Sequence, residues 1–292
     1  MFSIGNSIPV SANTSIPTNG TNRVEAMMSS NRKLSVLPEK EGLLVFLGKQ
    51  SVKEHKLHIL GQNIPRVFSG KPLYDLLFLT PDVKQEFDNS KQEIITGNTD
   101  RQNLQSNDLD MATGVAVGLA ARETITLLPE DVAIEKYRKI YVLGESYAGL
   151  PVLKCGDELL LPKDIVDRLQ QHNLLCLHDI RFTSCNSANL YEIKNFTSEE
   201  LNSSRESKRG WLAKLLFGDK ASLITHVSKE LEKRELNAKI TGYHGTGVFY
   251  VPEIGRPTTH LRSTTVPATP EQIVRRSDYK ATIFTNPKSE ID

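Results

Sequence analysis

Two nucleophilic side chains each follow a short apolar segment of the chain. Ser146 follows the apolar residues 140–143 within KIYVLGESYAG, and Cys185 follows residues 180–183 within DIRFTSCNSA. Each apolar segment is typical of a buried strand. In an open α/β sheet, reacting groups lie just beyond the carboxyl ends of the parallel strands. The sequence therefore predicts nucleophilic chemistry at a strand end, carried either by a serine hydroxyl or by a cysteine thiol.

The serine alternative rests on residues 144–149, whose sequence GESYAG is similar to the nucleophile motif of serine carboxypeptidases. A nucleophile elbow leads directly into a helix, whose first amide groups help to hold the oxyanion. Pro151 and Gly156 follow Ser146 instead, and they indicate a β-hairpin or a loop. A serine hydrolase that uses Ser146 is kept as an alternative, with His260 as its candidate histidine.

The segments around both nucleophiles alternate between strand-like and helix-like patterns. Apolar runs predict strands over residues 42–48, 140–143, 180–183 and 238–244. Helical patterns occupy residues 72–79, 111–126, 161–169, 211–217 and 223–236. Residues 83–110 are polar and predict a long loop, and the segment from Pro252 onward predicts a hairpin or a flap. This alternation predicts an α/β fold with a mostly parallel central sheet and helices on both faces.

Residues 1–38 differ from the rest of the chain because Ser, Asn and Thr dominate their first part. Such a segment cannot bury enough apolar surface to offset the entropy of ordering it. We expect a disordered N-terminal tail over residues 1–38, followed by a single domain over residues 39–292. The tail is similar to the uncleaved secretion signals of bacterial type III effectors, which implies a secretion chaperone as its partner.

The composition argues against several classes of function. The 36 basic and 35 acidic residues nearly balance, so the net charge of +1 indicates no general attraction to nucleic acid. The three cysteines and seven histidines form neither a CxxC pair nor an HExxH motif, and no metal site is predicted. Free thiols are typical of a reducing compartment. No apolar run approaches the roughly 20 residues that span a bilayer, so no membrane span is expected.

The order of elements between residues 135 and 250 resembles that of the caspase-like (clan CD) cysteine proteases. One predicted strand ends at residues 144–146, a hairpin and a helix follow, and a second strand ends in TSCNS at residues 183–187. This order is similar to the autoprocessing cysteine protease domains of large clostridial and MARTX toxins and to OspB-type type III secreted effectors. The resemblance implies a caspase-like fold and peptide-bond cleavage in a host protein substrate, with Cys185 as the nucleophile. It also implies a virulence effector, or toxin, that a type III-like route delivers to the host cell cytoplasm.

The chain departs from this family at the position of the catalytic base. The family has His-Gly at the end of the first strand, whereas this chain has Glu145 followed by Ser146. A carboxylate next to a thiol favours the neutral thiol, because two like charges oppose each other. One interpretation is a catalytically impaired pseudoprotease that acts by binding. The other is a relocated base: if the three strands lie side by side, His244 ends the strand on the other flank of Cys185.

The resemblance also implies a cofactor, because relatives of this kind are activated by inositol hexakisphosphate in a basic pocket away from the nucleophile. Several arginine and lysine side chains can hold one polyphosphate through charge-assisted hydrogen bonds. Two basic clusters of the sequence are candidates for this pocket. They are Arg205, Lys208 and Arg209 in the first cluster, and Arg275, Arg276 and Lys280 in the second.

Overall fold

A computed structural model describes residues 41–49, 61–101, 108–205, 220–249, 260–265 and 273–285. The chain divides into two units, Met1–Leu37 and Pro38–Asp292, and all of the described residues belong to the second. The tail expected over residues 1–38 and the helix expected over residues 211–217 lie outside the described residues, as do Lys208 and Arg209.

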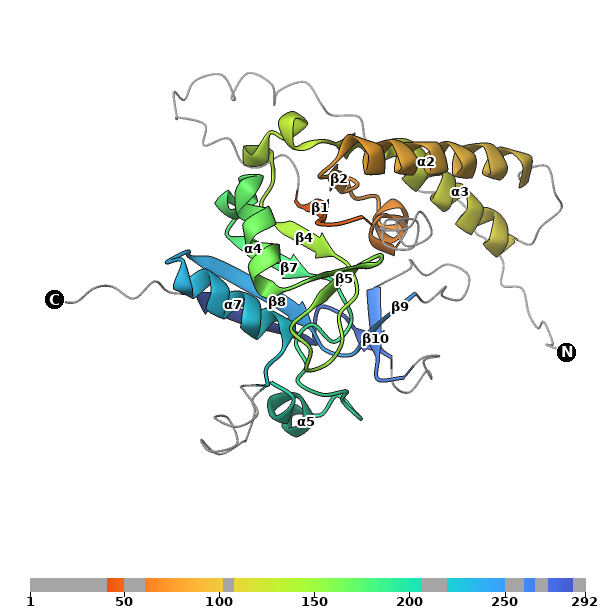
Figure 1. Cartoon of the computed structure of the whole chain (residues 1–292). Helices are drawn as coiled ribbons and strands as arrows, with labels where there is room; N and C mark the ends of the chain where they lie inside the picture. The colour runs from red at the N-terminus through yellow and green to blue at the C-terminus, as the bar shows by residue number, and fades with distance from the viewer. Residues whose placement is uncertain are drawn as a thin grey trace, which may run out of the picture. The chain divides into compact units, whose positions relative to one another are not determined.

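The second unit is built on a seven-stranded sheet with the strand order β12-β8-β7-β4-β1-β2-β3 (Figure 1). The strands from β8 to β3 in this order run parallel, and β12 lies antiparallel to β8 at one edge. The α/β fold and the mostly parallel sheet that the sequence predicts are therefore confirmed. The strands are β1 (Leu43–Phe46), β2 (Asp75–Phe78), β3 (Thr126–Leu127), β4 (Ile140–Leu143), β7 (Asp179–Phe182), β8 (Ala238–Tyr243) and β12 (Lys280–Thr285).

Helices flank this sheet, and two smaller antiparallel sheets accompany it. The α-helices are α2 (Pro81–Arg101), α3 (Asp108–Glu123), α4 (Pro162–Gln171), α5 (Ser198–Ser203) and α7 (Leu223–Lys233), with a further helix over residues 61–68. Single 3-10 turns are η2 (Pro129–Asp131), η3 (Ile134–Lys136) and η4 (Leu174–Cys176). β5 (Leu153–Cys155) and β6 (Glu158–Leu160) form a hairpin, as the residues after Ser146 indicate. β9 (Thr246–Phe249), β10 (His260–Ser263) and β11 (Val274–Arg275) form the other small sheet.

The helices α4 and α7 begin where their sequences provide capping groups. Pro162 occupies the first turn of α4, and the Asp164 carboxylate accepts a hydrogen bond from the Leu161 N–H at 2.9 Å. At the start of α7, the Ser222 hydroxyl accepts a hydrogen bond from the Thr225 N–H at 3.4 Å. Each helix then buries one apolar face, because its buried residues recur at helical spacing.

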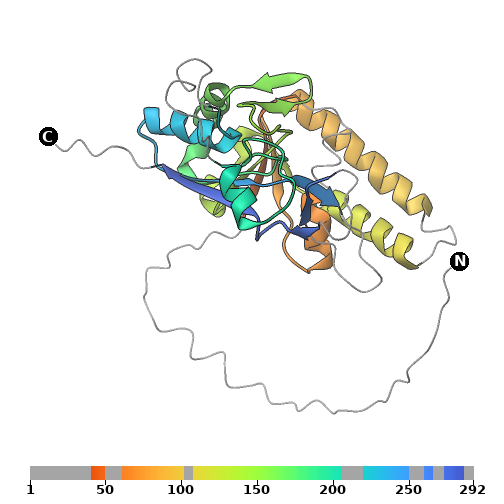
Figure 2. The ribbon, with the colours of Figure 1, turned by 90° about the horizontal axis from the view of Figure 1, so that it is seen from below.

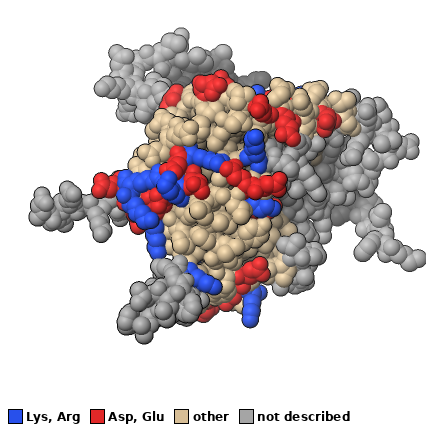
Figure 3. Space-filling view, viewed as in Figure 1, with Lys and Arg blue, Asp and Glu red and all other residues tan. Residues whose placement is uncertain are grey.

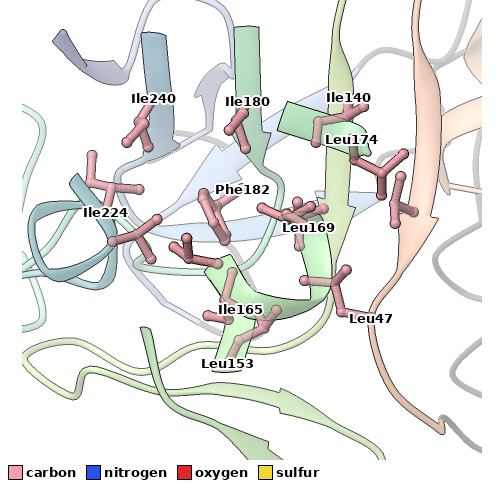
Figure 4. Packing of buried hydrophobic residues seen from close by; sticks show 14 of the residues in the cluster. Leu47, Ile140, Leu153, Ile165, Leu169, Leu174, Ile180, Phe182, Ile224 and Ile240 are labelled. Carbon is pink, nitrogen blue, oxygen red and sulfur yellow. The ribbon is translucent and has the colours of Figure 1, made fainter. Parts of the chain in front are cut away.

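Alternate residues of each strand pack on opposite faces of the sheet. Leu43, Val45 and Leu47 belong to the apolar cluster that packs against α4 and α7, which Figure 4 shows from close by. Leu44 and Phe46 instead join a second cluster that includes side chains of α2. Helices therefore cover both faces, with α7 beside α4 and the helix over residues 61–68 beside α3 (Figure 2). Burial on both faces explains why these strands are continuous apolar runs in the sequence.

Two expectations over residues 72–110 are wrong. The pattern of residues 72–79 predicts a helix, but residues 75–78 form β2. A short apolar run cannot distinguish a buried strand from a buried helix, and here β1 and β3 pair with it on either side. The polar residues 83–110 predict a loop, but α2 and the start of α3 occupy most of them. The buried stripe of α2 over residues 81–97 is narrow, because it consists of Val83, Phe87 and Ser90.

Charged side chains of both signs lie side by side on the face shown in Figure 3. Around α4 and α7, Arg234 pairs with Asp167 at 2.7 Å and with Glu230 at 2.9 Å. Ion pairs near the surface contribute little to stability, so we attribute the stability of the fold to its apolar clusters. No helix among the described residues is both long enough and apolar enough to cross a membrane.

Phe182 of β7 tests the apolar cluster that packs against α4. Its side chain is fully buried, so Phe182→Ala should lower the free energy of unfolding by about 3–5 kcal/mol. The matched control is Phe284→Ala on β12, because Phe284 is 64% exposed. The control should change stability by less than about 0.5 kcal/mol. Urea unfolding followed by circular dichroism gives both values, and equal losses would contradict this assignment of the core.

Candidate active site

The ends of three neighbouring strands bring the predicted site residues to one edge of the sheet. β7 pairs in parallel with β4 on one side and with β8 on the other, so the side-by-side arrangement expected from the sequence is present. Glu145 follows β4, Cys185 follows β7 and His244 follows β8. All three residues lie just beyond the carboxyl ends of their strands, where α/β proteins carry their chemistry.

The turn that carries Cys185 is fastened to the end of β8. The Asn186 N–H donates a hydrogen bond to the Gly245 carbonyl oxygen at 2.9 Å. Asn186 has a left-handed φ of 52°, a conformation that asparagine adopts more readily than most residues. The Cys185 thiol is half-buried, and its sulfur accepts a hydrogen bond from the Gly247 N–H at 3.4 Å. The turn therefore presents the thiol to the backbone of β9.

Ser146 is buried beneath this turn, with 3% of its surface exposed. Its hydroxyl donates a hydrogen bond to the Cys185 carbonyl oxygen, and its Oγ lies 2.9 Å from the Oγ of Ser184. Residues 147–152 form a loop that leads into β5, whereas a nucleophile elbow leads into a helix. These contacts give Ser146 the role of holding the Cys185 turn in place.

Glu145 is paired with a lysine. Its backbone N–H and carbonyl bond with those of Lys154 at 2.9 and 2.8 Å. Its carboxylate lies 3.4 Å from the Lys154 Nζ and accepts a hydrogen bond from the Tyr147 hydroxyl at 3.4 Å. Among the described side chains, no hydrogen bond joins the Glu145 carboxylate to Cys185. Glu145 is therefore bound to partners other than the thiol.

His244 is completely buried at the end of β8. Its Nδ1 lies 3.1 Å from the Asn189 Oδ1, and its Nε2 accepts a hydrogen bond from the Arg205 Nε at 3.3 Å. This network assigns the proton of the neutral ring to Nδ1. Burial, together with the positive charges of Arg205 and Arg262, lowers the pKa of His244 to about 4. The ring is neutral at physiological pH, and its basic nitrogen is bound to Arg205.

Arg262 completes the surroundings of Cys185, and the sequence does not predict it. The residue is 1% exposed, and its guanidinium lies beside the turn that carries Cys185. Its Nη1 donates to the Gly245 carbonyl oxygen at 3.1 Å, and its Nη2 donates to the Thr183 carbonyl oxygen at 3.0 Å. Arg262 reaches the site through the pairing of β10 with β9, and no local sequence signal records that pairing.

A pocket of about 480 Å³ gathers basic side chains that are distant in the sequence. The basic residues in its lining, which define the basic pocket, are Arg66, Lys71, Arg181, Arg275, Arg276 and Lys280. The structure therefore brings together the second predicted cluster and adds three residues that the sequence analysis missed. Arg205, from the first cluster, does not line this pocket, and its guanidinium contacts His244 and the carbonyl oxygen of Lys280.

Arg276 is the buried cation of the basic pocket, with 8% of its surface exposed. Its Nη1 donates a hydrogen bond to the Gln62 Oε1 at 3.2 Å, and its guanidinium lies 4.0 Å from the centroid of the Tyr243 ring. Its Nε and Nη2 have no hydrogen-bond partner among the described residues. Buried donors without a partner cost free energy, and an anion in the pocket could satisfy them.

A larger cleft, of about 1080 Å³, opens beyond the carboxyl ends of β1 and β2. Apolar residues such as Phe46 and Phe78 line it, together with Lys154, whose Nζ pairs with Glu145. Cys185 is not part of its lining. The candidate active site is therefore identified by the contacts of the Cys185 thiol and not by the volume of a cavity.

The pH dependence of stability tests the buried, neutral His244. Its pKa is 6.5 in the unfolded chain and about 4 in the fold, so protonation favours the unfolded state below pH 6.5. The wild type should therefore lose about 2–3 kcal/mol relative to His244→Gln between about pH 7.5 and about pH 4.5. Urea unfolding of both proteins at both pH values measures this change. A difference that is the same at both pH values would contradict a neutral, buried ring.

Comparison with known proteins gives no family for this chain. No family model matches the sequence, and no curated protein matches it. The α/β fold with its mostly parallel sheet is established by the structure. The resemblance to caspase-like proteases stays a hypothesis that rests on the order of the elements and on the residues that follow β4 and β7.

Proposed function

We propose that the protein is a caspase-like hydrolase that cleaves peptide bonds with Cys185 as the nucleophile. The observation that carries this proposal is the position of the thiol. It is half-buried at the end of a central parallel strand, and the Gly247 N–H is directed at its sulfur. The rival nucleophile, Ser146, is buried, and its hydroxyl is bound to the Cys185 carbonyl oxygen.

The proposed reaction is acyl transfer by a thiolate. The sulfur adds to the carbonyl carbon of the scissile peptide bond and forms a tetrahedral adduct. The carbon–nitrogen bond then breaks, the leaving amine takes a proton from water, and a thioester remains on Cys185. Water hydrolyses the thioester, which releases the carboxylic acid and restores the sulfur. The Gly247 N–H lies beside the sulfur, where a backbone donor can stabilise the developing oxyanion.

We place this activity in a secreted effector, or toxin, that a type III-like route delivers to the host cell cytoplasm, where it cleaves a host protein. Two features support this setting. One is the order of elements, which resembles that of secreted cysteine proteases. The other is the presence of three free cysteines, because a reducing cytoplasm keeps a thiol nucleophile in its active state.

A binding role is the second candidate function, and the contacts of the histidine favour it. Among the described side chains, no histidine forms a hydrogen bond with Cys185, and His244 is bound to Asn189 and Arg205. A pseudoprotease of this kind would hold a partner at the same edge of the sheet without cleaving it.

Expression in a eukaryotic cell separates these functions. Cys185→Ala should abolish toxicity, because it removes the nucleophile. The matched control is Cys176→Ala, which changes an exposed thiol and should leave toxicity unchanged. Circular dichroism confirms that each variant is folded. Full toxicity of Cys185→Ala would support the binding role, and loss with Ser146→Ala but not with Cys185→Ala would support a serine hydrolase.

We also propose that inositol hexakisphosphate binds in the basic pocket as a cofactor. The support is the gathering of six basic side chains around one cavity, together with the buried donors of Arg276 that lack a partner. Phosphate oxygens accept charge-assisted hydrogen bonds from such donors. Of the candidate residues, Arg275, Arg276 and Lys280 line this pocket.

Thermal unfolding with inositol hexakisphosphate tests the basic pocket. A ligand that binds only the folded state raises the unfolding midpoint. Arg276→Gln should weaken binding about tenfold or more, because it removes charge-assisted hydrogen bonds. Arg122→Gln on the exposed surface of α3 is the matched control and should keep the wild-type shift. Sulfate at equal ionic strength separates specific binding from a general salt effect. An unchanged wild-type midpoint would contradict the cofactor.

A further inference from the structure

We propose that the open edge of β6 docks an extended segment of the substrate protein as an added strand. This inference rests on the proposed function, because the segment belongs to the protein whose peptide bond is cleaved. β5 and β6 form a two-stranded hairpin, in light green in Figure 2. On the side away from β6, Lys154 of β5 pairs with Glu145. Among the described residues, β6 pairs only with β5, so its other edge is open.

The backbone of Leu159 points toward this open edge. In an antiparallel pair of strands, opposite residues alternate between those that bond with each other and those whose N–H and C=O groups point outward. Lys154 lies opposite Leu159, and both of its backbone groups bond with those of Glu145, at 2.8 and 2.9 Å. Lys154 and Leu159 therefore form an outward-pointing pair. The N–H and C=O of Leu159 are directed away from β5, where another strand can bond with them.

Two leucines make this edge apolar as well as open. Leu159 is 59% exposed, and Leu161, which is 52% exposed, follows it on the same side of the extended chain. An edge strand with exposed apolar side chains is a template for strand addition, because it offers both main-chain hydrogen bonds and apolar contacts. The partner that fits this edge is therefore an extended polypeptide with apolar side chains at alternate positions.

The inner face of the hairpin fixes the edge in place. Leu153, Cys155 and Leu160 are buried in the apolar cluster that packs against α4. On the same face, the Glu158 carboxylate forms a bidentate ion pair with Arg168 of α4, whose Nη1 donates to Glu158 Oε2 at 3.0 Å. The edge already has the conformation that strand addition requires, so docking does not have to order it.

The position of the hairpin relative to Cys185 favours a substrate as the partner. Glu145, which pairs with Lys154, follows β4, and β4 is the neighbour of β7, which ends before Cys185. A strand added to β6 would lie about four strand spacings from β7, on the order of 20 Å. An extended chain rises about 3.3 Å per residue, so a segment of about six residues spans this distance. One protein can therefore dock on β6 and present a peptide bond to Cys185.

Selection from a random peptide library tests the docking edge. Phage-displayed peptides of about 12 residues, which are long enough to cover the edge and reach Cys185, are selected on the full chain carrying Cys185→Ala. We expect enriched peptides with apolar residues at alternate positions, and a fluorescent synthetic copy should bind the same protein. Leu159→Asp in this background should weaken binding about tenfold or more, because docking would cover an unpaired carboxylate. The matched control is Phe284→Asp, which changes another exposed apolar side chain on an edge strand and should leave binding unchanged.

Methylation of single backbone nitrogens in the selected peptide shows whether it binds as a strand. Every second N–H of an added strand bonds with its neighbour, so binding should fall about tenfold at alternate positions and change little between them. Equal losses at successive positions, undiminished binding to Leu159→Asp, or the absence of enriched peptides would each overturn the proposal. A wild-type dimer that becomes a monomer in Leu159→Asp would overturn it as well, because a second copy would then occupy the edge.

The peptide and toxicity experiments fail independently. Peptide binding at β6 together with a fully toxic Cys185→Ala protein would keep the docking edge and reject the protease. A non-toxic Cys185→Ala protein without peptide binding would keep the protease and reject the docking edge.

Discussion

The pairing of β7 between β4 and β8 fixes the surroundings of Cys185. Parallel neighbours end at the same edge of a sheet, so the turns that follow these three strands meet there. Hydrogen bonds then fasten the turns to one another, from Ser146 to the Cys185 carbonyl oxygen and from Asn186 to Gly245. With the turns fixed in this way, the Gly247 N–H of β9 donates to the sulfur, and Arg262 of β10 donates to the carbonyl oxygens of Thr183 and Gly245.

Positive charge dominates the region between the thiol and the basic pocket. The Tyr243 ring lies 5.1 Å from the Arg262 guanidinium and 4.0 Å from that of Arg276. Arg276 lines the basic pocket, whereas Arg262 donates to the backbone on either side of Cys185, at Thr183 and Gly245, so the Tyr243 ring lies near both regions. Burial, together with the charges of Arg205 and Arg262, keeps His244 neutral, and these cations favour anionic groups nearby.

Local patterns predicted four of the seven strands of the sheet, β1, β4, β7 and β8, because strands buried on both faces are continuous apolar runs. They failed at β2, where a short run fits a helix equally well, and at α2, where few residues are buried. The positions of Glu145, Cys185 and His244 followed from chain order, but their contacts did not. The second basic cluster was predicted, whereas Arg66, Lys71 and Arg181 joined it through packing of distant segments.

The amino-acid sequence by itself determined four strands, β1, β4, β7 and β8, their order along the chain and the residues that follow them, because apolar runs and turn-forming residues act over a few positions. Folding in three dimensions decided which of those residues touch. The burial of Ser146, the direction of the His244 ring and the hydrogen bond from Arg262 to the Thr183 carbonyl oxygen depend on segments far apart in the sequence. The charge around the thiol depends on distances between such segments, and local residue patterns do not encode those distances.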